Sequence, residues 1–110
     1  MRKDSTRYVS NKHEKQTAKE LGGKVQISSG SSPFFKGDVV LENCLVECKT
    51  CMTPKKSFSI KLEWLDKIRE QCIQMRKRFP ILAFNFGEGQ NYYIIDEATM
   101  KKFVEFLEQE

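Results

Sequence analysis

A carboxylate and an ammonium group stand two residues apart in the segment 44–50, at Glu47 and Lys49. The segment is otherwise largely apolar, and its composition predicts a β-strand. Side chains alternate between the two faces of a strand, so Glu47 and Lys49 share one face. Val46 and Cys48 then share the other face and point into an apolar core.

A second carboxylate, Asp38, lies in the preceding strand candidate, 37–41. If that strand pairs antiparallel with 44–50, Asp38 lies near the face of Glu47 and Lys49. Two carboxylates beside one lysine suit Mg²⁺, which takes one or two carboxylates together with water and substrate phosphates. The lysine can then orient or activate a water, or offset charge on a phosphate.

The E-x-K pattern alone has a simpler interpretation. In a chain with 31% charged residues, a Glu and a Lys on one strand face are more often a surface ion pair that contributes little. Three features favour the metal site instead. The pattern lies on an apolar strand, Gly37 and Asp38 open the strand before it, and a Ser/Gly loop precedes that strand.

The elements that must position these residues follow from composition and periodicity. A first helix is predicted over 11–21, because Gly22-Gly23 follows it. Strands are predicted over 24–28, 37–41, 44–50, 80–86 and 91–95.

Two more helices are predicted in the second half of the chain. One runs from an N-cap at Ser59 to Pro80 and the other over 97–108, capped by Asp96. The apolar stripes at helical spacing are Trp64, Leu65, Ile68, Cys72, Met75 and Phe79 on the former, and Met100, Phe103, Val104 and Leu107 on the latter. The polar face opposite the former stripe carries Lys61, Lys67, Glu70 and Lys77. The resulting order, α-β-β-β-α-β-β-α, predicts an α/β domain with a central mixed sheet flanked by helices.

Two stretches carry a family resemblance. Gly37-Asp38-Val39-Val40, followed by Leu45-Val46-Glu47-Cys48-Lys49-Thr50, resembles the signature of the PD-(D/E)XK (restriction-endonuclease-like) nucleases. With the loop 28–31, the order of elements is similar to that of archaeal Holliday-junction resolvases and their small phage-borne relatives. The resemblance spans about Glu14 to Asp96.

The resemblance implies a role for each matching residue. Asp38, Glu47 and the main-chain carbonyl of Cys48 would bind Mg²⁺, for which Mn²⁺ can substitute, and Lys49 would be the catalytic lysine. Glu14 would be the acidic residue of the first helix, with Glu20 as its competitor. Ser29 and Ser31 would contact phosphate near the scissile bond. Gly37 stands where the family has proline, and the first helix is short.

Positive charge is concentrated at the start of the chain. Residues 1–36 hold 8 basic and 3 acidic residues, whereas residues 37–110 hold 11 and 12. Such a segment attracts polyanions, although a solvated basic leader explains it equally well. The candidate DNA contacts are Lys12, Lys15, Lys36, Arg76 and Arg78. For the last two, interaction with a helix dipole is the simpler alternative.

Size and composition bound the remaining possibilities. The 110 residues allow one domain, predicted over 11–110 after a flexible basic leader at 1–10. Apolar runs are short and the N-terminus lacks a signal sequence, so we expect a cytoplasmic protein (host cytoplasm if phage-encoded) without membrane contact. The cysteines Cys44, Cys48, Cys51 and Cys72 are expected to be reduced thiols, mostly in the core.

The function expected from these features is Mg²⁺-dependent hydrolysis of DNA by a structure-selective endonuclease. The resemblance implies a Holliday-junction resolvase that acts as a homodimer on branched DNA in recombination or repair, without a small-molecule cofactor. Two alternatives stay open. One is a nuclease of the same fold that acts on linear, nicked or foreign DNA. The other is a module of this fold that binds DNA or a partner without cutting.

Overall fold

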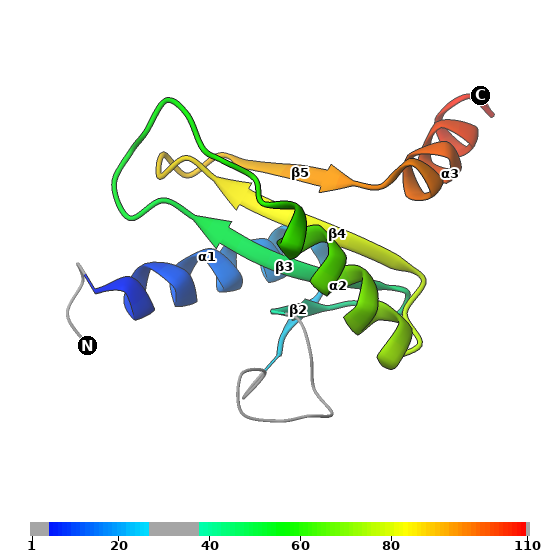
Figure 1. The fold of residues 1–110 in the computed structure, drawn as a ribbon, viewed down its shortest axis with the longest axis horizontal. Helices are drawn as coiled ribbons and strands as arrows, with labels where there is room; N and C mark the ends of the chain where they lie inside the picture. Colours follow the sequence, from blue (N-terminus) through cyan, green and yellow to red (C-terminus); the bar gives the residue numbers. More distant parts are fainter. Residues whose placement is uncertain (1–4, 27–37, 110) are drawn as a thin grey trace.

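The computed structural model describes residues 5–26 and 38–109. Its elements follow the order α1 (Thr6–Leu21), β1 (Lys24–Val25), β2 (Val39–Val40), β3 (Cys44–Thr50), α2 (Leu62–Gln74), β4 (Phe79–Asn85), β5 (Asn91–Ile95) and α3 (Glu97–Leu107). The strands form one mixed sheet in the order β1-β2-β3-β4-β5 (Figure 1). The predicted α/β class is therefore confirmed.

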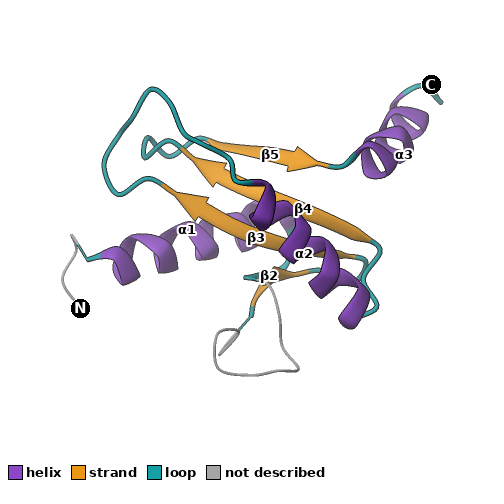
Figure 2. Cartoon of the chain, viewed as in Figure 1, coloured by secondary structure: helices purple, strands orange, loops and turns teal. Residues whose placement is uncertain are grey.

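The two central strands, β3 and β4, run parallel, and all other neighbours are antiparallel. A parallel pair needs a crossover, and α2 supplies it between β3 and β4. Helix α1 covers the opposite face, where Ala18 packs with Val39, Val46 and Ala83 (Figure 2). On the α2 face, Ile68 packs on Leu45. As predicted, Val46 lies in an apolar core under one face.

Helix α1 begins five residues earlier than predicted, so a leader over residues 6–10 is wrong. The Ser5 hydroxyl accepts the backbone N–H of Tyr8 at 3.1 Å and caps the helix. The helix ends as predicted at Gly22, whose φ of 75° is accessible to glycine without strain. Residues 1–4 of the predicted leader lie outside the described part of the chain.

Helix α2 is shorter than the predicted helix at both ends. Its N-cap is Lys61, not Ser59, and its last residue is Gln74. Arg76 takes a left-handed conformation (φ 57°), and the backbone N–H groups of Arg78 and Phe79 both donate to Asn43 O at 2.9 Å. The chain therefore leaves the helix to enter the sheet, and Phe79 becomes the first residue of β4.

The remaining elements differ from the predictions mainly in length and packing. Strands β3 and β5 have the predicted bounds, whereas β1 and β2 contain two residues each. Asp96 caps α3 as predicted, with its carboxylate accepting Thr99 N–H at 2.9 Å. The prediction that every helix flanks the sheet is wrong for α3, in which no residue is buried. No helix among the described residues has the length and apolar content needed to cross a membrane.

Candidate active site

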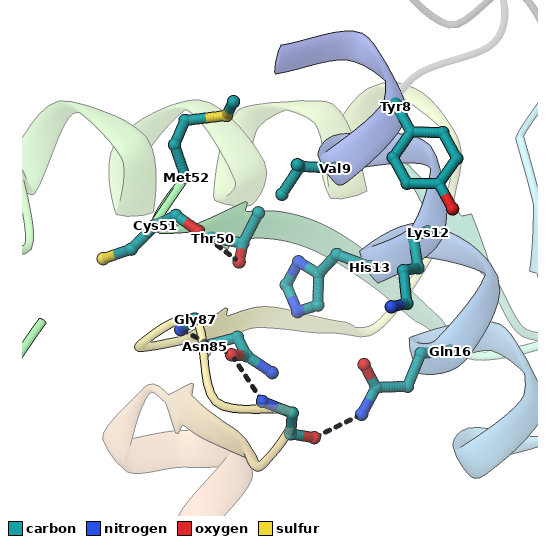
Figure 3. Close-up of a pocket in the computed structure, with 11 residues that line it drawn as sticks. Tyr8, Val9, Lys12, His13, Gln16, Thr50, Cys51, Met52, Asn85 and Gly87 are labelled. Carbon is teal, nitrogen blue, oxygen red and sulfur yellow. Dashed lines mark hydrogen bonds between the residues drawn. The ribbon is translucent and has the colours of Figure 1, made fainter. Parts of the chain in front are cut away.

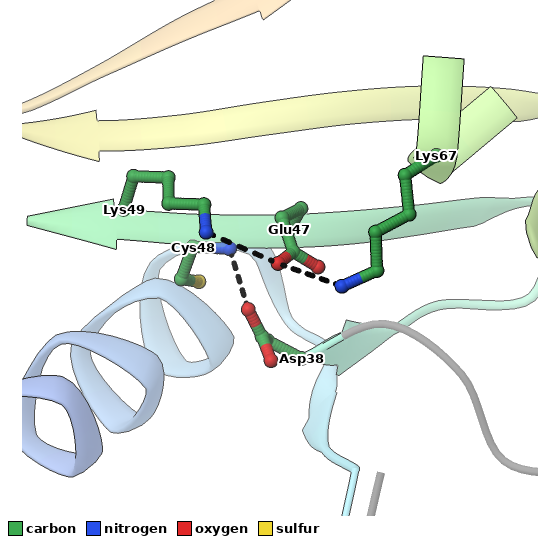
Figure 4. Close-up of polar contacts among 5 residues, drawn as sticks. All are labelled: Asp38, Glu47, Cys48, Lys49 and Lys67. Carbon is green, nitrogen blue, oxygen red and sulfur yellow. Dashed lines mark hydrogen bonds and ion pairs between the residues drawn. The ribbon is translucent and has the colours of Figure 1, made fainter. Parts of the chain in front are cut away.

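The turn between β2 and β3 brings Asp38 to the edge of β3. Val39 pairs with Val46, and the Asp38 N–H donates to Val46 O at 2.8 Å. One residue beyond this pairing, Asp38 Oδ2 accepts the backbone N–H of Cys48 at 2.7 Å (Figure 4). The carboxylate thus takes the place of a backbone acceptor just before β2 begins.

Glu47 lies beside Asp38 and is buried, with only 8% of its surface exposed. Its Oε1 lies 3.7 Å from Lys49 Nζ and 4.0 Å from Lys67 Nζ, which reaches the site from α2 (Figure 4). Glu47 and Lys49 therefore share a face, as the strand alternation predicted. A buried carboxylate with two ammonium groups differs from the surface ion pair of the simpler interpretation.

Lys49 has an aromatic neighbour as well. Its Nζ lies 4.6 Å from the centroid of the Trp64 ring, a cation–π distance. Trp64 in turn lies against Phe58, which stacks on Phe84 at 6.0 Å. The aromatic cluster on the α2 face thereby limits where the ammonium group can lie.

Burial makes both carboxylates harder to ionise. It raises the pKa of Asp38, although the Cys48 N–H and the charges of Lys49 and Lys67 lower it in part. Burial and the nearby Asp38 charge raise the pKa of Glu47, again against the two lysines. A divalent cation between the two carboxylates would favour their charged forms.

The oxygen atoms at the β3 edge are suitable ligands for a hard cation that also binds water and phosphate. The N–H and C=O of one strand residue face the same neighbour, so the Cys48 carbonyl also faces the Asp38 side. The described residues contain no group of three or more His, Cys, Asp or Glu placed to hold a metal. Asp38, Glu47 and the Cys48 carbonyl would leave the remaining positions to water and substrate, as Mg²⁺ prefers.

The structure separates the two candidates for the acidic residue of the first helix. Glu14 is half-buried on α1, and burial raises its pKa to about 7, with further increases from the charges of Asp38 and Glu47. Glu20 is exposed and accepts a hydrogen bond from Gln16 at 3.3 Å. Burial and electrostatic interaction with Asp38 and Glu47 therefore favour Glu14 over Glu20.

The predicted DNA contacts that the structure describes do not gather on one surface. Lys12 and Lys15 are exposed on α1, and Lys12 lines a pocket with Thr50, the last residue of β3. Arg76 and Arg78 are exposed near Asn43, just before the first residue of β3. The two sets thus lie toward opposite ends of this strand. The other predicted contacts, Ser29, Ser31 and Lys36, lie outside the described residues.

A polar network lies beneath α1, beside the site. Asn91 Oδ1 lies 2.8 Å from His13 Nε2 and accepts Asn85 Nδ2–H at 3.1 Å, while Asn91 Nδ2–H donates to Thr17 Oγ1 at 3.0 Å. Two members of the network, His13 and Asn85, line a pocket of about 230 Å³ between α1 and the ends of β3 and β4 (Figure 3). Burial lowers the pKa of His13, which favours the neutral ring.

Two site residues were not predicted from the sequence. Lys67 was placed on the polar face of α2, yet its long side chain reaches Glu47. Trp64 was placed on the apolar stripe of the same helix, and its contact with Lys49 was not foreseen.

Comparisons with family models, with curated proteins and with solved structures found no match to this chain.

Proposed function

We propose that this protein is a Mg²⁺-dependent endonuclease with a restriction-endonuclease-like fold that hydrolyses phosphodiesters of branched DNA. The observation that carries the proposal is the convergence of Asp38, Glu47 and Lys49 at the edge of β3, with one carboxylate bonded to the strand and the other buried beside two lysines. Burying two carboxylates together costs stability, so the arrangement calls for a compensating cation.

The residues at the β3 edge have distinct roles in this proposal. Asp38 and Glu47, with the Cys48 carbonyl, hold the metal. Bound there, Mg²⁺ would stabilise charge on the phosphate and lower the pKa of a bound water. Lys49 lies on the same strand face and is held by Glu47 and Trp64, so its ammonium group can orient the attacking water or offset charge in the transition state.

Glu14 has a supporting role in the same mechanism. With a pKa of about 7, its carboxyl group can hold or exchange a proton near neutral pH. Its place on α1, within the electrostatic reach of Asp38 and Glu47, supports the role of holding metal-associated water. The resemblance to junction resolvases supports branched DNA as the substrate class, which two symmetry-related copies would cut on paired strands.

Cleavage assays with defined substrates test the proposal. Labelled four-way junction, linear duplex and single strand are incubated with Mg²⁺ or with EDTA, using wild type and Lys49→Ala. The matched control is Lys102→Ala, an exposed lysine on α3. We expect metal-dependent cleavage of the junction alone, lost in Lys49→Ala and retained in the control.

The other outcomes separate the alternatives. Cleavage of every substrate would indicate a nuclease that acts on linear or foreign DNA and that does not select junctions. Binding of DNA without cleavage under Mg²⁺ or Mn²⁺ would overturn the nuclease proposal in favour of a non-cutting module.

A further inference from the structure

A group of aromatic rings forms a continuous surface on the α2 face of the sheet. We call it the aromatic shelf, and its members are Phe58, Trp64, Phe84, Phe86 and Tyr92. Centroids of neighbouring rings in the shelf lie 5.3 to 6.5 Å apart. None of these side chains is buried, and Tyr92 on the edge strand is 49% exposed. The fold therefore leaves part of a large aromatic cluster open to a ligand.

The strand register connects the shelf to the candidate active site. Lys49 of β3 is the partner of Phe84 in β4, and Phe84 is the partner of Tyr92 in β5. Partners on neighbouring strands point to the same face, so these three side chains form one row. The row extends over two strand spacings, or ~10 Å. Because stacked nucleotides rise ~3.4 Å each, a strand with a phosphate at Lys49 reaches Tyr92 within about three nucleotides.

Positive charge surrounds the shelf. The segment 49–62 contains four lysines and no acidic residue, the lysines being Lys49, Lys55, Lys56 and Lys61. Two of the ammonium groups lie near the ring of Trp64, with Lys49 Nζ 4.6 Å and Lys61 Nζ 5.8 Å from its centroid. Glu63 and Glu88, which adjoin shelf residues in the sequence, are exposed and offset only half of this charge.

The loop between β3 and α2 holds two of these lysines beside the shelf. The Lys55 N–H donates to Phe86 O at 2.9 Å, and a Cβ at Gly87 would come within 2.9 Å of the Pro54 backbone. The loop therefore packs tightly on the end of β4, next to the turn that leads to β5 (Figure 1). Lys55 and Lys56 are both exposed there. Aromatic rings together with cations are typical of sites for single-stranded nucleic acid, in which bases stack and phosphates are neutralised.

We propose that the aromatic shelf binds unpaired nucleotides of a DNA strand, with a base stacked on Tyr92 and phosphates held by the lysines of segment 49–62. At a branch point bases lose stacking neighbours, and an exposed ring replaces the lost contact. The inference rests on the proposed function, because the shelf begins at Lys49, and it adds which part of a branched substrate the site recognises. A regular duplex keeps its bases stacked inside and offers the shelf only phosphates.

Fluorescence anisotropy with a labelled short oligothymidine in EDTA tests the shelf without cleavage. We expect Tyr92→Ala to raise the dissociation constant about tenfold, as for the loss of one stack between a base and a ring. Tyr92→Phe keeps the ring and should bind like wild type. Tyr93→Ala is the matched control, because Tyr93 is 39% exposed and pairs with Ala83, whose side chain packs in the core on the α1 face. Far-ultraviolet circular dichroism verifies that each variant stays folded.

The same oligothymidine paired with oligoadenosine separates stacking from charge. Tyr92→Ala should leave binding of this duplex unchanged, since its bases are not free to stack on the ring. Lys56→Ala should weaken binding of both DNAs and reduce the slope of log affinity against log salt by about one. Lys102→Ala, an exposed lysine on α3, is the control for loss of charge away from the shelf.

The fluorescence of Trp64 provides a measurement that needs no substitution. Trp64 is the only tryptophan of the chain, and a strand that runs from Lys49 to Tyr92 passes its ring. We expect oligothymidine to quench the emission of wild type, with the dissociation constant found by anisotropy. This result stands even if a shelf variant fails to fold.

Several outcomes would overturn the shelf. They are a wild type whose Trp64 emission does not respond to oligothymidine, a Tyr92→Ala variant that binds oligothymidine like wild type, and equal losses in Tyr92→Ala and Tyr93→Ala. Equal losses for oligothymidine and duplex in Tyr92→Ala would show that the ring does not act by stacking and would overturn it too.

Failure of the shelf and failure of the proposed function are distinguishable. A protein that binds oligothymidine through Tyr92 but does not cleave junctions with Mg²⁺ keeps the shelf and overturns the nuclease. A metal-dependent nuclease whose Tyr92→Ala variant binds oligothymidine like wild type keeps the catalytic assignment and overturns the shelf.

Discussion

The ammonium group of Lys49 lies 4.6 Å from the centroid of the Trp64 ring, so a residue of the first turns of α2 helps to position the lysine of β3. Glu47 Oε1 lies 3.7 Å from the same ammonium group. The lysine is therefore restrained by an aromatic face and a carboxylate together. Replacing either contact should increase the freedom of the ammonium group.

Trp64→Leu tests this restraint. Leucine preserves an apolar side chain but removes the aromatic face, and we expect DNA cleavage to fall about tenfold, given ~1–2 kcal/mol for a partly desolvated cation–π contact. Phe58→Leu alters the same aromatic cluster without touching Lys49 and serves as the control. Single-turnover rates measure the effect. Equal losses in both variants would show that the cluster acts through packing and not through Lys49.

Asp38 makes a structural hydrogen bond and is also a predicted metal ligand. Two substitutions separate these two roles. In Asp38→Asn the side-chain oxygen can still accept the Cys48 N–H, so we expect a folded protein without cleavage activity. Asp38→Ala leaves that N–H without its acceptor and should also lower the free energy of unfolding by about 1–3 kcal/mol. Urea denaturation and the cleavage assay measure the two effects. Cleavage by Asp38→Asn at the wild-type rate would contradict the metal-ligand role.

Glu47→Gln provides a test of metal binding that does not depend on activity. The buried Glu47 carboxylate has a raised pKa, so the neutral amide should make the metal-free protein at least as stable as wild type near pH 7. Mg²⁺ should raise the melting temperature of wild type, because a ligand that binds only the folded state stabilises it. The variant should show no such increase. Equal increases in wild type and Glu47→Gln would place the metal elsewhere.

The raised pKa of Glu14 predicts a pH-dependent loss of stability. Its pKa is about 7 in the folded protein, whereas an unperturbed glutamate has a pKa of 4.5, so the unfolded chain releases the proton first as pH rises. Stability should therefore fall between pH 4.5 and 7 without divalent metal.

Glu14→Gln removes the part of this dependence that comes from Glu14, whereas Asp38 and Glu47, whose pKa values are also raised, still contribute to it. The variant should match wild type below the lower pKa and exceed it above the higher one by about 1 kcal/mol, after allowance for solvent around a half-buried carboxylate. Glu20→Gln, on the exposed part of the same helix, is the control. Urea denaturation at acidic and alkaline pH measures the difference, and identical pH profiles for wild type and Glu14→Gln would contradict the assignment.

Local patterns in the sequence determined where some elements begin and end and which side chains share a strand face. The alternation in 44–50 predicted β3 with its correct bounds and placed Glu47 and Lys49 on one face, because side-chain direction in a strand follows from covalent geometry. Asp96 predicted the start of α3 for a similar reason, since a helix cap involves residues only three apart.

The tertiary structure decided what depends on contacts between distant residues. Lys67 and Trp64 join the site only because the α2 crossover lies over β3, and Glu14 differs from Glu20 only through the burial that α1 acquires on the sheet. The stripe of α3 was visible as a period in the sequence, but its exposure was not. A period shows that a face is apolar, whereas the packing of the whole chain determines whether that face meets the sheet or is left for another molecule.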